Sequence, residues 1–256
     1  MPISDNLIRL GKCERELQSK AYEWASDDSD LSAHLDMTER AMDLLDVLAK
    51  GQVEAIDDGR AIQHLGIRVF NGFATAWQLM SSGYFQVAAM VQRDLVETIA
   101  LANFFHYFPE KLPIWLGADR KQLVRDFGPS QVRKALDAQT GMGKSRREAV
   151  YYKFSSLAAH ACVEGFAMLR PVGMDSQVGP FMDRTALKAL LEEQGQLAAQ
   201  AGLTFATYID QSTPLATGVT HRLMTGVMEY GNRFLGMRYT PEDFSELDRI
   251  YRVETA

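Results

Sequence analysis

Cysteine is nearly missing from this chain, and the two that occur have no partner in the sequence. Cys13 and Cys162 lie far apart, and neither has a histidine or a second cysteine at the spacing of a zinc site. Isolated thiols are typical of proteins kept in a reducing cytoplasm, where disulfides do not persist. We therefore predict a cytoplasmic protein with no disulfide framework, no metal site and no cofactor.

The chain also lacks a strong excess of charge of one sign. Its 27 basic and 33 acidic residues leave a formal net charge of -6. This modest acidic balance gives no support to general binding of nucleic acid or of an anionic membrane, although a local basic patch remains compatible with it. The N-terminus has no apolar core of the kind found in secretory signals.

A long apolar run is missing as well. Val69–Gln92 contains no charged residue and has the length of a membrane span, but Asn71, Gln78 and Gln86 are among the polar side chains that interrupt it. Ser81–Gly83 has the composition of a turn. We therefore predict two buried helices joined by a short turn, and no membrane partner.

What the sequence does contain is helical periodicity. Leu10, Leu17 and Trp24 recur at two-turn intervals on a charged background, and no stretch shows the alternation of a strand. No linker rich in proline or serine and no repeat of fixed period divides the chain. These patterns predict an all-α fold with one domain, 1–256, made of about eight helices and interrupted by an irregular segment near residues 168–180.

Apolar stripes and capping residues set the limits of the expected helices. The acidic tract 26–30 is expected to form a loop that caps the second helix, Gly51 to end that helix, and Thr240 to cap the last one. The third helix should bury one stripe, which consists of Ile62, Leu65, Val69, Phe73, Ala76 and Met80. The long helices are expected at about 7–24, 32–50, 53–80, 84–108, 145–166, 184–209 and 214–236.

The most informative stretch is the helix over 84–108, because ionised groups lie at the middle of an apolar segment. Arg93 and Glu97 are four residues apart, so they share a helix face and can pair, with Asp94 beside them. Such charges must be paired, catalytic or directed at a cleft, because burying them alone is costly. Two interpretations stay open: an ion pair that braces helix packing, or a polar cleft in which the guanidinium binds an anion.

The helix expected at 145–166 carries a second polar face. Tyr152, Ser156 and His160 follow one another at intervals of four. If this face meets the helix over 84–108, one buried polar cluster or ligand-binding site results, made of Arg93, Glu97, Tyr152, Ser156 and His160.

Metal and nucleophile patterns give no competing site. The Glu-x-x-His motif of di-iron bundles does not occur, and neither does a Gly-x-Ser-x-Gly elbow. His34 is interpreted as a surface or capping residue of the second helix.

Three short motifs suggest a family. Arg93–Glu97 is followed by the aromatic stretch Phe104–Glu110, and later by Tyr152 and the segment Leu157–His160. In these features the region of about 60–165 resembles a loose group of bacterial and phage-defence-associated helical proteins with a HEPN-like fold. The resemblance implies a helical bundle that forms dimers, with Arg93 and His160 as the residues to test.

Ribonucleases of HEPN type share an arginine and a histidine with four to six residues between them. No arginine in this chain is followed by a histidine at that spacing, and Arg60 and His64 come nearest, with three residues between them. We therefore predict an interaction or small-ligand-binding module rather than an enzyme, with a small anionic ligand and without nucleic acid. A HEPN-like ribonuclease or stress and defence effector is the alternative. A homodimer is expected because Trp24, Trp115 and Tyr239 lie outside the core stripes.

Overall fold

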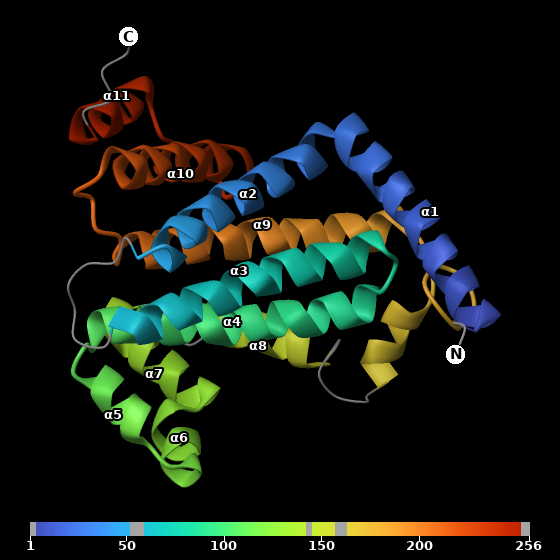
Figure 1. Cartoon of the computed structure of the whole chain (residues 1–256), viewed down its shortest axis with the longest axis horizontal. Coiled ribbons are helices and arrows are strands. Elements are labelled where there is room, and N and C mark those ends of the chain that lie inside the picture. Colours follow the sequence, from blue (N-terminus) through green and yellow to red (C-terminus); the bar gives the residue numbers. More distant parts are fainter. Residues whose placement is uncertain (1–3, 52–58, 142–144, 157–162, 252–256) are drawn as a thin grey trace.

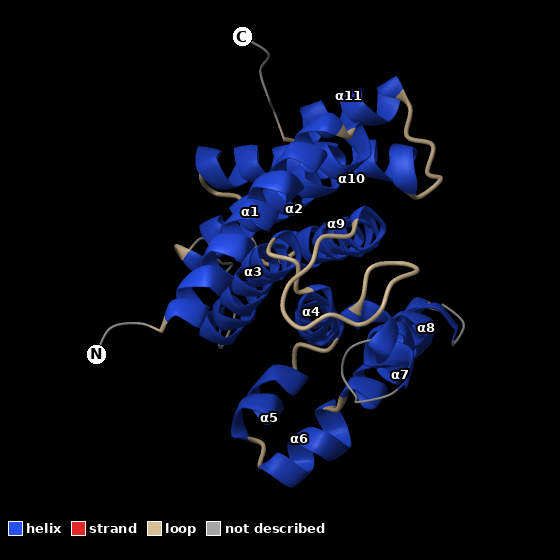
Figure 2. Ribbon diagram, turned by 90° about the vertical axis from the view of Figure 1, so that its right-hand side faces the viewer, coloured by secondary structure: helices blue, strands red, loops and turns tan. Residues whose placement is uncertain are grey.

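The computed structural model describes residues 4–51, 59–141, 145–156 and 163–251. Within these ranges the chain forms helices and loops and no strand (Figure 2), which confirms the all-α class. The expected number of about eight helices is too low, because residues 111–140 fold into three separate short helices. The helices of the described ranges are α1 (Asp5–Asp27), α2 (Ser29–Ala49), α3 (Gly59–Ser81), α4 (Phe85–Tyr107), α5 (Lys111–Gly117), α6 (Arg120–Phe127), α7 (Pro129–Thr140), α8 (Ser145–Phe154), the 3₁₀ helix η2 (Val163–Leu169), α9 (Arg184–Ala206), α10 (Pro214–Phe234) and α11 (Pro241–Ile250).

Four long helices, α2, α3, α4 and α9, form the centre of the molecule (Figure 1). α9 packs against both α2 and α4, and apolar or small side chains bury it on several sides. Gly195 lets its neighbours approach closely, since a Cβ there would lie 2.6 Å from the Tyr230 hydroxyl oxygen. α10 and α11 lie on the outer side of α2, α1 leaves α2 at one end, and α5–α7 project from the opposite end (Figure 1).

The predicted stripe of α3 is buried as expected, from Ile62 to Met80. α3 and α4 are joined by the predicted turn, in which Gly83 has φ +88° and its carbonyl accepts a hydrogen bond from the Phe181 amide. A Cβ on Gly83 would lie 2.4 Å from the Phe181 carbonyl oxygen, so the turn requires glycine. No helix in the described part of the chain has the length and apolar character needed to span a bilayer.

The helix ends follow the capping residues closely, with one correction. Thr240 forms a capping box with Asp243, and Gly51 follows α2 with φ +96°, both as predicted. The acidic tract 26–30 is not a loop: α1 continues to Asp27, and Asp28 alone separates it from α2. Because the Asp28 side chain accepts from two backbone amides of α2, a single residue suffices to end one helix and begin the next.

The region after α7 differs more from expectation. The single helix expected over 145–166 is wrong, since α8 ends at Phe154 and a separate 3₁₀ helix, η2, begins at Val163. Residues 170–183 form no helix or strand, as the predicted irregular segment near 168–180 requires. The start of the third predicted helix, 53–58, lies outside the described residues.

Candidate functional site

α7 and α8 pack against α4 (Figure 2), and the charged residues at the middle of α4 lie at this contact. Arg93 is partly buried and its guanidinium is surrounded by acceptors. Its Nε donates to Ser155 Oγ at 3.0 Å and its Nη2 to the Tyr151 hydroxyl at 2.7 Å. Nη2 also lies 2.9 Å from Glu97 Oε1, so the predicted pair of Arg93 and Glu97 is present. This arginine therefore ties the end of α8 to the middle of α4.

The partners of Arg93 on α8 are the neighbours of those expected from the sequence. Tyr151 and Ser155 contact it, whereas Tyr152 is 58% exposed and Ser156 Oγ donates to the Lys153 carbonyl. The structure thus brings together Arg93 and Glu97 but not Tyr152 and Ser156, and His160 lies outside the described residues.

A neighbouring residue explains which face of α8 turns inwards. Phe154 is 2% exposed, and Tyr151 lies three positions before it, on the same helix face. An apolar anchor at this end of the helix was the signal that sequence reasoning missed. Because Phe154 is buried, the polar residue of α8 that faces α4 is Tyr151 and not Tyr152.

A second arginine, Arg133 of α7, completes the site and was not predicted. The centre of its guanidinium lies 4.1 Å from the centroid of the Tyr151 ring, and that of Arg93 lies 5.1 Å from the same ring. The Nη1 atom of Arg133 is buried and has no hydrogen-bond partner among the described residues. A buried donor without an acceptor is costly, so this atom marks a position where an acceptor is needed.

Arg133, Tyr151 and Glu97 border a pocket of about 210 Å³. One part of its wall is charged and the other apolar. The lining residues are Arg68, Asp94, Val96, Glu97, Thr98, Ala100, Leu101, Phe127, Pro129, Val132, Arg133 and Tyr151.

The surroundings of Glu97 disfavour the charged form of its carboxyl group. Burial raises the pKa of its carboxyl group, while the positive charge of Arg93 acts in the opposite direction. Although Arg93 Nη2 is close to Glu97 Oε1, that buried oxygen accepts no hydrogen bond from any residue that the structure describes. Arg68 and Asp94 form a further ion pair at 2.5 Å on the pocket rim, where both side chains are exposed to solvent.

The carboxylates of the pocket face arginines rather than further metal ligands. No group of three or more His, Cys, Asp or Glu side chains comes together in the parts of the chain that the structure describes. The chemistry that these residues offer is therefore recognition of charge and of planar groups by guanidinium, with an apolar wall beside it.

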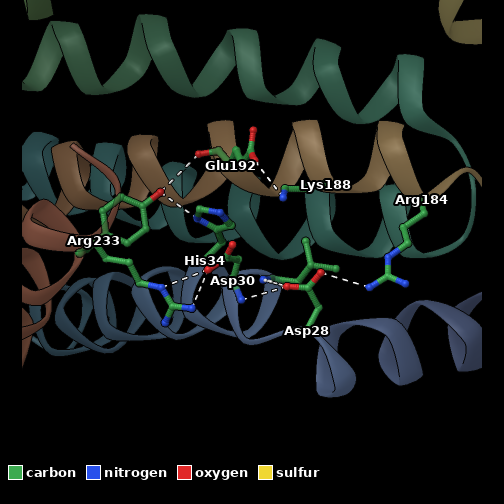
Figure 3. A network of polar contacts seen from close by, with 9 residues as sticks. Asp28, Asp30, His34, Arg184, Lys188, Glu192 and Arg233 are labelled. Carbon is green, nitrogen blue, oxygen red and sulfur yellow. Dashed lines mark hydrogen bonds and ion pairs between the residues drawn. The ribbon is translucent and has the colours of Figure 1, made fainter. Parts of the chain in front are cut away.

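A second polar region lies where α2, α9 and α10 meet (Figure 3). On its rim Arg233 pairs with Asp30 at 2.6 Å, and Arg184 with Asp28 at 3.1 Å. At its centre is His34, which is 1% exposed and therefore not the surface or capping residue that the sequence indicated.

The His34 ring is held by aromatic neighbours. Its Nδ1 forms a 2.9 Å hydrogen bond with the Tyr230 hydroxyl, and its centroid lies 4.4 Å from that of Phe234. Burial lowers the pKa of His34 to about 4, so the ring is neutral at pH 7. These contacts could not be predicted from local spacing, because Tyr230 and Phe234 lie almost two hundred residues further along the chain than His34.

No protein-family model, curated protein or solved structure matches this chain. The function is therefore inferred from the geometry of the pocket beside α4.

Proposed function

We propose that this protein is a ligand-binding module that holds the anionic group of a small molecule in the pocket between α4, α7 and α8. The observation that supports this best is the buried Nη1 atom of Arg133, which has no acceptor among the described residues. A guanidinium N–H is among the strongest donors in proteins, and an anion on the ligand would supply the missing acceptor. Tyr151 holds the guanidinium in place by stacking against it.

Binding is favoured over catalysis by the way the other charges are used. Glu97 and Asp94 each lie against an arginine, and Arg93 is occupied by Tyr151 and Ser155. These groups supply fixed charge and orientation. The imidazole that a HEPN-like ribonuclease would need is that of His160, outside the described residues.

Calorimetric titration tests the proposal. Benzoate and inorganic phosphate serve as probes, each titrated into wild-type protein, Arg133→Ala and the control Arg120→Ala. Arg120 is an exposed arginine at the start of α6 and is not a lining residue of the pocket. We expect saturable binding of at least one probe by the wild type and the control, and a loss of about tenfold or more in Arg133→Ala, because charge-assisted hydrogen bonds contribute about 1.5–3 kcal/mol. If neither anion binds the wild type, the proposal fails.

The ribonuclease alternative makes a different prediction. If it is right, His160→Ala and Arg93→Ala should both abolish cleavage of a single-stranded RNA while the melting temperature of His160→Ala stays unchanged. Under the binding proposal the wild type does not cleave RNA, and Arg93→Ala lowers the melting temperature.

We also propose that the protein is a cytoplasmic homodimer. Two of the three aromatic residues that suggested a dimer are used within the chain: Trp115 packs against Phe105 at 5.4 Å between ring centroids, and Trp24 packs against the α1–α3 end of the core. Tyr239 remains 37% exposed. Light scattering tests the dimer, because a measured particle mass near 28.7 kDa, the mass of one chain, would exclude it.

A further inference from the structure

The size of the pocket limits its ligand. Typical pockets for drug-sized molecules or cofactors measure about 300–1,000 Å³, and this one is smaller, about 210 Å³. An engineered protein cavity of about 150 Å³ binds benzene. The pocket beside α4 therefore has room for a six-membered ring and one small polar group, and not for a nucleotide.

The charges around the pocket limit the ligand further. Arg68, Arg133, Asp94 and Glu97 line the pocket, and their charges cancel. Arg93 does not line it but pairs with Glu97, so it adds a single positive charge to the site as a whole. A monoanion neutralises this surplus. A phosphate dianion would instead meet two carboxylates at close range, with a repulsion that burial makes stronger.

The hydrogen-bond donors suit a planar anion. Arg133 presents the edge of a planar fork, a shape that matches the two oxygens of a carboxylate. Its Nη1 is the donor that has no acceptor within the described ranges of the chain. The Tyr151 hydroxyl accepts from Arg93, so its own proton is left to donate to a second ligand oxygen.

The remaining wall is apolar. Leu101 of α4, Phe127 at the end of α6 and Val132 of α7 all line the pocket, and Phe127 and Val132 are themselves nearly fully buried. An uncharged ligand body placed against these side chains would be removed from water, which contributes about 25 cal/mol for each Å² of apolar surface buried. A bare inorganic anion would gain nothing from this wall.

Taken together, we infer that the ligand is a small monocarboxylate with a compact apolar body, close to benzoate in size, whose carboxylate pairs with Arg133 and whose body lies against Leu101, Phe127 and Val132. This inference rests on the proposed function and specifies the ligand class of the same pocket. Glu97 is well placed to sense the ligand, because it lines the pocket and burial raises the pKa of its carboxyl group.

Four probes separate the contributions of charge and apolar body. Benzoate carries both, acetate carries the charge, benzyl alcohol carries the ring, and inorganic phosphate carries charge in a tetrahedral group. We expect the wild type to bind benzoate at least tenfold more tightly than any of the other three. Arg133→Lys should keep the charge but lose the fork and bind benzoate severalfold more weakly, and Arg133→Ala should lose at least tenfold.

A variant of the apolar wall completes the test. Val132→Thr keeps the shape of the side chain and adds a hydroxyl, so we expect it to weaken benzoate severalfold and to leave acetate unchanged. Phosphate or acetate binding as tightly as benzoate, in an Arg133-dependent manner, would overturn the monocarboxylate inference and leave the proposed anion site intact. Benzyl alcohol binding as tightly as benzoate would overturn the inference too. Binding of no anion would overturn the proposed function itself.

Discussion

The two polar regions of this molecule differ in which of their polar groups are buried and which are exposed. Where α2, α9 and α10 meet, the ion pairs stay at the rim, and the Arg233 and Asp30 side chains are 42% and 43% exposed. The buried centre of that region is His34, which burial keeps neutral. The Nε2 atom of His34 is buried without a hydrogen-bond partner in the described part of the chain, but its ring is neutral. Beside α4, by contrast, the buried atoms that have no partner among the described residues belong to charged groups, a carboxylate oxygen of Glu97 and a guanidinium nitrogen of Arg133.

This difference supports the proposal that the region at His34 serves packing and the region beside α4 serves binding. Burying a neutral ring with one nitrogen unpaired costs less than burying charged groups, which is strongly unfavourable unless something compensates them. Groups with strongly disfavoured charge that face a pocket are candidates for function. The predictions below change one region at a time and compare it with the other.

The largest expected effect concerns the pH dependence contributed by His34. Its pKa is about 4 in the folded protein and near 6.5 when unfolded, so the unfolded state takes up a proton first as the pH falls. The contribution to the free energy of unfolding is complete above pH 6.5 and decreases as the pH falls towards 4, by about 2–3 kcal/mol between pH 7.5 and 4.5. Urea unfolding at the two pH values measures it.

His34→Gln should remove this part of the pH dependence, while His106→Gln, a change at an exposed histidine of α4, should keep it. Equal pH dependence in wild type and His34→Gln would show that the ring is not held neutral by its surroundings.

The next effect separates the ion pairs of the two regions. Arg93→Met should lower the free energy of unfolding by about 2 kcal/mol, because it leaves the buried oxygen of Glu97 without its cation. The matched change Arg233→Met breaks an exposed pair and should cost about 1 kcal/mol or less. Adding Glu97→Gln to Arg93→Met should restore part of the loss. Equal losses in the two single variants, measured by urea unfolding, would contradict the distinction between the regions.

A smaller loss is expected at the hydroxyl of Tyr230. Tyr230→Phe removes the 2.9 Å partner of His34 Nδ1 and should lower the free energy of unfolding by about 1–2 kcal/mol, the cost of an unsatisfied buried polar atom. Tyr239→Phe, at a partly exposed tyrosine, is the control and should change it little. An unchanged unfolding midpoint in Tyr230→Phe would mean that this hydrogen bond does not stabilise the packing of α2 against α10.

The smallest effect is on affinity. Glu97→Gln removes one of the two negative charges that face the ligand, so benzoate should bind severalfold more tightly at pH 7. The pKa of Glu97 is raised by burial, and in the wild type lowering the pH should therefore strengthen binding of benzoate for as long as the ligand itself stays ionised. Calorimetry at pH 7.5 and 5.5 checks this, and a Glu97→Gln variant with weaker binding would contradict it.

The sequence predicted well what depends on neighbours along the chain. The buried stripe of α3, the turn at Gly83 and the capping box at Thr240 all follow from local spacing and from the conformational needs of single residues. The same rules identified Arg93 and Glu97 as a pair on α4, since the contact lies within one helix.

Contacts between helices were harder to predict. The face of α8 that meets α4 is decided by the burial of Phe154, and so Tyr151 rather than Tyr152 reaches Arg93. Arg133 was missed because nothing in its own helix distinguishes it from an exposed arginine. Its role depends on a contact with the Tyr151 ring of another helix, and periodicity within one helix does not predict contacts between helices.

The most direct test of the central claim is the side-chain NMR signal of Arg133 during a titration with benzoate, recorded on ¹⁵N-labelled full-length protein. We predict that its Nε–H resonance shifts in a saturable way and that the resonance of Arg120 does not. Saturable binding of benzoate that leaves the Arg133 resonance unchanged would show that the anion is held elsewhere, and the pocket beside α4 would not be the binding site.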